Sequence, residues 1–208
     1  MALVKYNNNS ISAVTAAASI PNGAMTLIKT LTASSSATLS FVDGSSDVVL
    51  DSTYPIYVFK FINIHAGTHA ADFTFNGSTD GGSNYNVTKT TTTWYSSHNE
   101  SDSLTQFTYD GGHDIAQGTG FCQIGGDAMG TDNDQSCSGT MFLFNPSSTT
   151  FVKHFMVTMS TLTEADYNVN ERTGGYCNTT SAIDAVQFKM SSGNIDAGKI
   201  KLYGIKDS

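Results

Sequence analysis

Apolar and polar residues alternate in short runs along most of the chain, and this pattern predicts β-strands separated by polar turns. The strongest candidate covers residues 56–64, where both faces are apolar, so we expect a central strand that is covered on both sides. Phe73 and Phe75 alternate with Asp72 and Thr74, as in a half-buried strand. The remaining strand candidates are residues 25–32, 37–42, 48–50, 85–95, 104–109, 141–145, 151–160, 185–190 and 199–205.

About ten short strands at this spacing predict an all-β fold, either an antiparallel β-sandwich or a jelly roll. Residues 162–167 are the one helix-like stretch, and they are too few to matter for the core. Asp80 and Gly81, within the polar turn at 78–84, form a dipeptide that is a strong hairpin signal. The sequence has no repeat with a period of roughly 20–50 residues, which argues against a solenoid or a propeller.

The first two dozen residues differ from the rest of the chain. A polar cluster at 7–10 is followed by a stretch of small residues at 11–20, which Pro21, Asn22 and Gly23 close. The side chains of such a segment are too small to fill a core, so residues 1–24 are expected to form an extended arm that lies on a partner surface. A frayed terminus is the alternative. Residues 25–208 would then form the β-sandwich domain.

Composition excludes several classes of partner. Only 13% of the residues are charged and the net charge is -8, so no basic stripe is present that could bind nucleic acid. No apolar run reaches the roughly 20 residues of a membrane-spanning helix. The first residues lack the pattern of a signal peptide, which predicts a protein that stays in a cytoplasm or leaves by another route.

The cysteines and histidines indicate neither a metal site nor a cofactor. Cys122, Cys137 and Cys177 are widely spaced and odd in number, and we expect buried free thiols, with a bridge between the first two left open. His65 and His69 stand four apart, but at the exit of a strand, where hydrogen bonds within a loop are the better explanation.

The search for chemistry gives no catalytic residues. The acidic segment from Asp127 to Asp134 contains hard oxygen ligands that suit calcium, but it departs from the EF-hand pattern, and a solvated surface loop is the favoured interpretation. Nucleophile elbows, phosphate-binding loops and zinc-protease motifs are missing from the sequence, and no two glutamates can be placed in one cleft. The chain is therefore expected not to be an enzyme.

Aromatic residues offer the one candidate binding site. Trp94 and Tyr95 follow four consecutive threonines at 90–93, and with Tyr85 and Tyr109 they can form a platform on which a sugar ring stacks. The alternative is that these rings fill the core of the sandwich.

Several stretches resemble a group of uncharacterised marine tailed-bacteriophage virion proteins. The stretches are Tyr-Val-Phe-Lys-Phe-Ile-Asn-Ile-His (57–65), Phe-Thr-Phe-Asn (73–76), Ser-Thr-Asp-Gly-Gly-Ser-Asn-Tyr-Asn-Val-Thr-Lys (78–89), Leu-Phe-Asn-Pro-Ser-Ser-Thr-Thr-Phe-Val-Lys-His (143–154) and Lys-Ile-Lys-Leu-Tyr-Gly-Ile (199–205). The opening at 3–15 is similar to the starts of other phage particle proteins whose bodies differ. The resemblance brings no catalytic residues.

The resemblance implies a virion structural protein that assembles in the cytoplasm of a bacterial host. The expected role is a capsid decoration protein or a short tail or fibre component, with major capsid or tail proteins as partners. A carbohydrate- or receptor-binding module for host-surface glycans is the alternative. The low charge favours a homo-oligomer, and the resemblance favours a trimer, with Tyr203, Lys201 and the threonines at 90–93 as candidate contacts.

Overall fold

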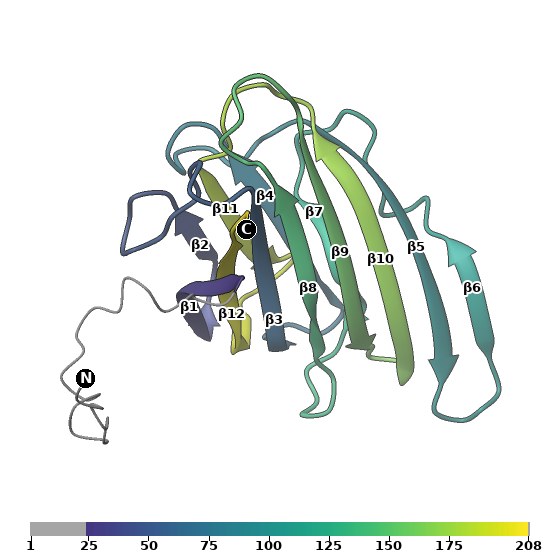
Figure 1. Cartoon of the computed structure of the whole chain (residues 1–208). Coiled ribbons are helices and arrows are strands. Elements are labelled where there is room, and N and C mark those ends of the chain that lie inside the picture. The colour runs from purple at the N-terminus through teal and green to yellow at the C-terminus, as the bar shows by residue number, and fades with distance from the viewer. Residues whose placement is uncertain (1–23, 208) are drawn as a thin grey trace, which may run out of the picture.

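Two antiparallel β-sheets pack face to face in the structure, a computed structural model that describes residues 24–207 (Figure 1). The expected arm at residues 1–24 lies, except for Ala24, outside the described residues. Along the chain the strands are β1 (Met25–Ser36), β2 (Leu39–Val42), β3 (Ile56–Ala66), β4 (Ala71–Ser78), β5 (Lys89–Asn99), β6 (Thr105–Tyr109), β7 (Cys122–Met129), β8 (Cys137–Phe144), β9 (Lys153–Leu162), β10 (Tyr167–Cys177), β11 (Ala185–Met190) and β12 (Ile195–Ile205).

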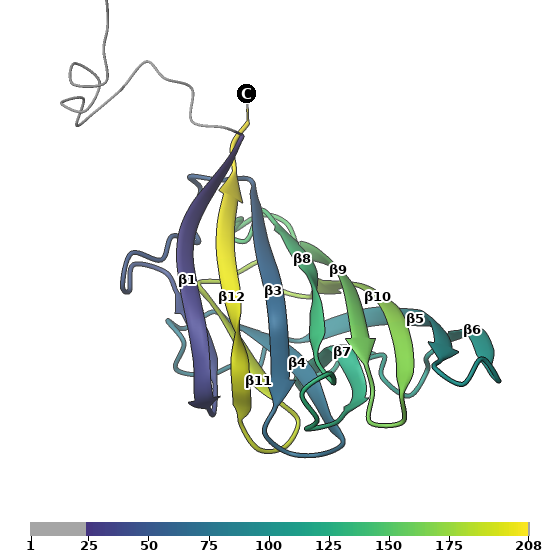
Figure 2. The ribbon, with the colours of Figure 1, turned by 90° about the horizontal axis from the view of Figure 1, so that it is seen from below.

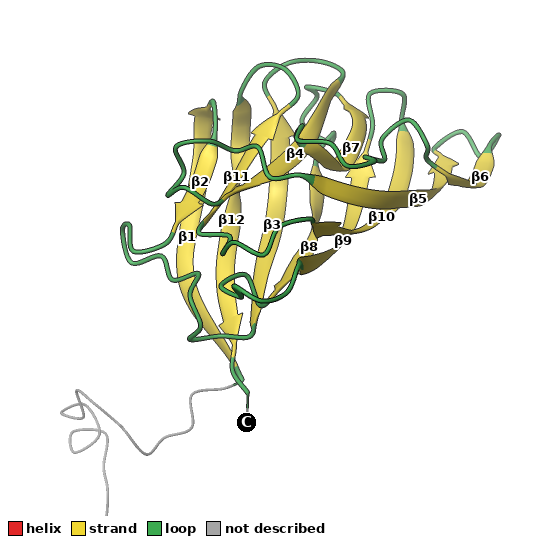
Figure 3. Cartoon of the chain, turned by 90° about the horizontal axis from the view of Figure 1, so that it is seen from above, coloured by secondary structure: helices red, strands yellow, loops and turns green. Residues whose placement is uncertain are grey.

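The larger sheet has eight strands in the order β1-β12-β3-β8-β9-β10-β5-β6, and the smaller has four in the order β2-β11-β4-β7. All pairings are antiparallel, so the predicted all-β sandwich is confirmed. From β2 onward the chain passes repeatedly between the sheets, through the loops that Figure 3 shows. Within the described residues, no helix has the length and apolar character needed to cross a membrane.

Strand β3 shows why this sequence forms the core. Tyr57, Phe59 and Phe61 are buried against the small sheet, while Val58 and Lys60 between them point to the opposite face. Phe188 of β11 meets this strand from the other sheet, with ring centroids 5.2 Å from those of Phe59 and Phe61. These edge-to-face contacts place the aromatic residues of both sheets in one continuous core.

The large sheet extends beyond the small one. β7 is the last strand of the small sheet, and β5 and β6 continue past it, so the inner faces of these two strands are not covered by a facing strand (Figures 1 and 3). In Figure 2 the large sheet spreads as a curved fan from β1 to β6. The two ends of its outer face therefore look in different directions.

Several sequence expectations about elements were wrong. β7 and β10 were not predicted, and residues 48–50 form no strand. The expected hairpin at Asp80-Gly81 is absent, because β4 and β5 lie in different sheets. The turn itself is present: Asp80 accepts hydrogen bonds from the Asn84 backbone N–H and side-chain amide, at 2.9 and 2.7 Å, and these bonds lower the pKa of Asp80 to about 2.

Candidate functional site

Every second side chain of the large sheet points away from the core, and the strand register aligns these side chains in rows. One row crosses all eight strands in the order Thr30, Lys201, Lys60, Thr140, Thr158, Arg172, Trp94 and Tyr109. The next row runs Leu27, Tyr203, Val58, Phe142, Met156, Gly174 and Thr92. The outer face thus has an apolar half near β1 and a half near β6 that holds the tryptophan.

The half near β6 contains an open depression of about 400 Å³, within the size range of small-molecule sites. Its outward lining residues, which define the depression below, are Thr92, Trp94, Met156, Thr158, Arg172 and Gly174. Arg172 and Trp94 are the single arginine and the single tryptophan of the chain. The guanidinium carbon of Arg172 lies 5.7 Å from the Trp94 ring centroid, and the Phe107 ring packs on Trp94 at a centroid distance of 5.2 Å.

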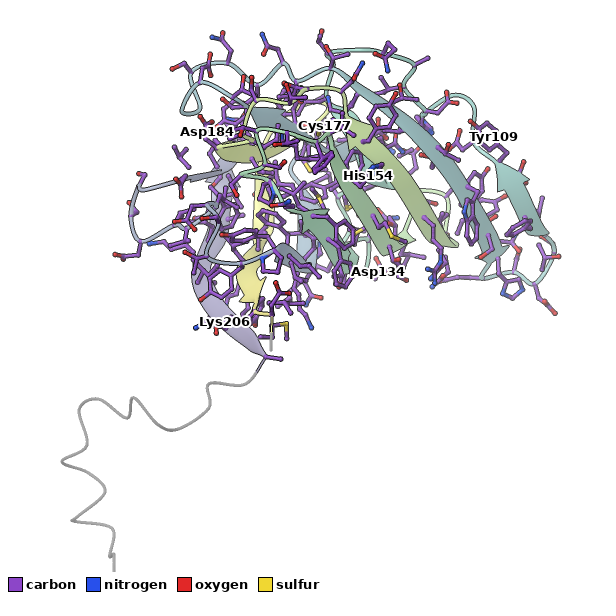
Figure 4. All side chains as sticks on the ribbon, turned by 45° about the horizontal axis from the view of Figure 1, so that its top comes forward. Tyr109, Asp134, His154, Cys177, Asp184 and Lys206 are labelled. Carbon is purple, nitrogen blue, oxygen red and sulfur yellow. The ribbon has the colours of Figure 1, made fainter. Side chains whose placement is uncertain are left out.

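Gly174 forms the floor of the depression. Its strand neighbours are Met156 on β9 and Thr92 on β5, and Arg172 and Tyr176 are the nearest outward residues along β10 itself. The Tyr176 ring packs on His154 at a centroid distance of 6.0 Å; Figure 4 labels His154 beside β9 and β10. Gly174 is therefore surrounded by larger outward side chains on every side.

The half near β1 carries what we call the apolar strip. It consists of two aligned rows, Leu27, Tyr203, Val58 and Phe142, and Met25, Ile205, Ile56 and Phe144. Met25 and Leu27 are 43% and 50% exposed, whereas Val58 is only 1% exposed, because side chains of the adjacent strands flank it. The Phe142 and Phe144 rings stack on each other. A contiguous apolar surface of this kind marks an interaction site.

The outer face has an unusual charge balance for a chain with a net charge of -8. The outward positions of β1, β3, β5, β8, β9 and β10, and those of β12 from Lys199 onward, contain no aspartate or glutamate. Their charged residues are Lys60, Arg172, Lys199 and Lys201. Lys60 and Lys201 stand directly opposite each other, an arrangement that destabilises a strand pair. The ion pairs seen among the described residues, His69–Glu164, His98–Asp102 and His113–Asp110, involve neither lysine.

The four predicted aromatic residues do not form one platform. Trp94 and Tyr109 are strand neighbours on the outer face, with Tyr109 at the β6 edge (Figure 4). Tyr95, the next residue after Trp94, faces inward, and Tyr85 lies in the loop between β4 and β5, where its carbonyl accepts a hydrogen bond from the Asn76 side chain. Adjacent strand residues point to opposite faces, so Trp94 and Tyr95 cannot contact one ligand ring together.

Tyr95 lines a second cavity, of about 290 Å³, under the inner face of the part of the large sheet that extends beyond β7. Its phenol oxygen accepts a hydrogen bond of 2.6 Å from the Gln106 side-chain amide. Glu164 lies on the opposite wall, with a carboxylate oxygen 2.6 Å from Nε2 of His69. Tyr95 and Gln106 of this cavity are thus paired with each other and Glu164 is paired with His69, whereas the depression on the outer face leaves its floor open.

The other candidates give no metal site within the described residues, where no three His, Cys, Asp or Glu side chains converge. The backbone of His65 in β3 lies opposite Ala197 of β12, and the His69 side chain forms an ion pair with Glu164. In the predicted calcium segment, Asp132 and Asp134 are exposed, and the side chain of Asp127 is outside the described set. Cys122, Cys137 and Cys177 are all buried and free, as the sequence predicted.

Sequence reasoning missed Arg172, Gly174, Met156 and Thr158 as lining residues. Arg172 and Gly174 belong to β10. The sequence of this strand has a weak strand pattern, because a glutamate and two glycines interrupt the alternation of apolar and polar residues that begins at Val169 and Asn170. The sequence does show that the chain has one arginine and one tryptophan. Their contact could not be inferred, because it depends on the pairing of β10 with β5, which the sequence does not reveal.

Comparison with known proteins gives no match to this chain, whether among family models, curated proteins or solved structures.

Proposed function

We propose that the chain is a non-enzymatic structural protein of a bacteriophage particle, either a capsid decoration protein or a short tail or fibre component. The observation that carries the proposal is the apolar strip, which needs a cover that the described chain does not supply. The resemblance of residues 57–65 and 143–154 to phage virion proteins supplies the context. The site of action would be the virion, after assembly in the bacterial cytoplasm.

The occupant of the strip that we propose is a neighbouring copy of the same chain in a homotrimer. Lys60 and Lys201 border the strip, and a net charge of -8 leaves the rest of the chain acidic. Packing the strip on an acidic patch of the next copy offsets the repulsion between the two lysines and forms a closed ring of like contacts. A two-fold contact of strip on strip would instead bring four lysines together.

The attachment element in this proposal is the N-terminal arm. Met25 pairs with Ile205, and the backbone N–H of Lys206 donates to the carbonyl oxygen of Ala24, so the described chain begins at the corner of the apolar strip. An arm leaving from this corner reaches the shell while the rest of the sandwich projects. We also propose that the sandwich is a jelly roll, because the chain crosses repeatedly between the sheets, from β2 through β5, from β6 through β8 and from β10 through β12, although β5 and β6, and β8, β9 and β10, are consecutive within the large sheet.

Incorporation into particles tests the proposal. The full chain, a chain lacking residues 1–24, and a control with Phe151→Ser are each supplied to assembling particles of the virus. Phe151 is 69% exposed but lies outside the apolar strip, so the control should be incorporated like the full chain. The truncated chain should be lost from purified particles. Equal incorporation of the truncated chain would contradict the role of the arm.

A second candidate function, a module that binds host-surface glycans, is favoured by one observation. Trp94 and Arg172 stand side by side at the rim of an open depression, and neither is needed to fill the core. An aromatic ring combined with a charged hydrogen-bond donor is a common way to hold a sugar. Trp94 and Arg172 lie on the side of the depression toward β6, away from the strip. Glycan binding by these two residues is therefore compatible with assembly through the strip.

A further inference from the structure

Gly174 lies inside strand β10, at a position where the fold does not require glycine. Its φ angle is not in the left-handed region, and a Cβ added there would meet no atom within 4 Å. Gly175 beside it differs, because a Cβ there would lie 2.7 Å from a carbon of the Phe155 ring and 2.7 Å from the Thr90 carbonyl oxygen. Glycine weakens a strand interior and often marks the close approach of a ligand.

The groups around Gly174 define the chemistry of such a ligand. The Trp94 ring and the Met156 thioether, which is 58% exposed, are apolar and polarisable surfaces on two sides. Thr92 and Thr158 supply hydroxyl groups that can donate or accept hydrogen bonds. This mixture matches a sugar ring, which has apolar C–H faces and a rim of hydroxyl groups.

The charge of the site selects a particular kind of sugar. Arg172 offers a fork of N–H donors that fits a carboxylate, and its guanidinium group lies against Trp94. No outward residue of β5, β9 or β10 is acidic, although the chain as a whole carries a net charge of -8. The positive charge at the depression is therefore a local feature that favours an anionic ligand.

We propose that the depression binds a saccharide that bears a carboxylate, of the uronic or sialic acid type. The sugar ring lies over Gly174 between Trp94 and Met156, and its carboxylate pairs with Arg172. This inference rests on the glycan-binding candidate function and identifies its ligand class and its site. The depression adjoins the apolar strip, because Met156 and Phe142 are strand neighbours, so saccharide binding and assembly are measured separately.

The test is binding of the purified full chain to an array of oligosaccharides that end in a uronic or a sialic acid, each printed beside its carboxyl-reduced counterpart. Hits are titrated by calorimetry. Trp94→Ala and Arg172→Gln should each weaken binding at least about tenfold, and Arg172→Gln should remove the preference for the acidic form. Gly174→Thr should abolish binding while the melting temperature stays equal or rises, because threonine favours strands.

Gly120→Thr is the matched control, since a Cβ at Gly120 also meets nothing within 4 Å and the residue lies outside the depression. It should bind like the unchanged protein. Three results would overturn the proposal: no acidic saccharide bound at millimolar concentration, full binding by Gly174→Thr, or equal binding of acidic and reduced sugars. Binding of an acidic peptide in place of any sugar would also overturn it. Particle incorporation of the Trp94→Ala variant, measured separately, distinguishes a failure of this site from a failure of assembly.

Discussion

At the scale of single residues, the inner face carries an unusual row of Lys89, Cys177 and Lys153. Both lysines are fully buried, and their amines donate to backbone carbonyls, Lys89 to Gly120 at 2.7 Å and Lys153 to Ser181 at 2.6 Å. Burial lowers the pKa of both lysines. Burial also raises the pKa of Cys177 to about 11, although the neighbouring lysines act in the opposite direction.

The buried thiols should be unreactive toward thiol reagents in the folded protein. Cys122, Cys137 and Cys177 are at most 2% exposed, and burial raises the pKa of each, so little reactive thiolate is present. We expect no reaction with a thiol reagent such as a dithiobis-nitrobenzoate at pH 8 and three equivalents after unfolding in guanidinium. A full equivalent that reacts rapidly in the native protein would contradict the burial of at least one cysteine.

Alkaline pH should destabilise the fold through the same thiols. Burial raises the pKa of Cys122 from 9.0 to about 12, so between these values the unfolded chain loses a proton that the folded chain keeps. The stability from this thiol is complete below pH 9 and falls by about 1.4 kcal/mol per pH unit above it. Urea unfolding at pH 8, 9, 10 and 11 measures the slope.

The Cys122→Ala variant isolates the contribution of this one thiol from the other titrating groups. Its free energy of unfolding should be lower at pH 8, because a small cavity is left, but should fall less steeply above pH 9 than that of the unchanged protein. Identical slopes for the two proteins would show that Cys122 ionises equally in the folded and unfolded chain, which would contradict its burial.

At the scale of elements, the sequence predicted strands best where burial dictates the pattern. The strand at 56–64 is β3, apolar on both faces because the small sheet covers one side and neighbouring side chains cover Val58 on the other. β7 and β10 were missed because glycine and polar residues interrupt their alternation, and their pairing with distant strands supplies the missing stability. The two adjacent glycines of β10 differ in cause: neighbouring atoms leave no room for a Cβ at Gly175, whereas nothing lies within 4 Å of a Cβ at Gly174.

Gly174 and Gly175 should respond oppositely to alanine. Gly175→Ala forces a Cβ to within 2.7 Å of both the Phe155 ring and a backbone carbonyl oxygen, which should destabilise the protein by about 1–3 kcal/mol. Gly174→Ala meets open space and should be neutral or stabilising, by up to about 1 kcal/mol. Denaturant unfolding of the two variants measures both effects. Equal destabilisation would mean that Gly174 has a structural role after all.

At the scale of the whole molecule, the outer face of the large sheet divides into two halves of different chemistry. The apolar strip over β1, β12, β3 and β8 lies where the described chain begins, and the depression over β9, β10 and β5 lies toward the β6 edge. In β12, Ile200 and Leu202 are buried and Lys201 and Tyr203 face outward, as their alternation in the sequence indicates. It could not show the strip, because the strip combines strands from the two ends and the middle of the chain.

Self-association should depend on the strip. The purified full chain should sediment as a trimer, and Leu27→Ser combined with Phe142→Ser should give a folded monomer, because the change removes two of the exposed apolar contacts. Phe151→Ser, a change at a 69% exposed ring outside the strip, should remain trimeric. A full chain that stays monomeric at high concentration would rule out the trimer.

Electron cryomicroscopy of intact particles can show whether copies of this chain assemble on the virion through the apolar strip. We predict three-fold clusters of the twelve-stranded sandwich on the particle, with the apolar strip of each copy covered by its neighbour and the depression turned outward. Particles without the protein, or isolated single copies whose strip faces solvent, would contradict it.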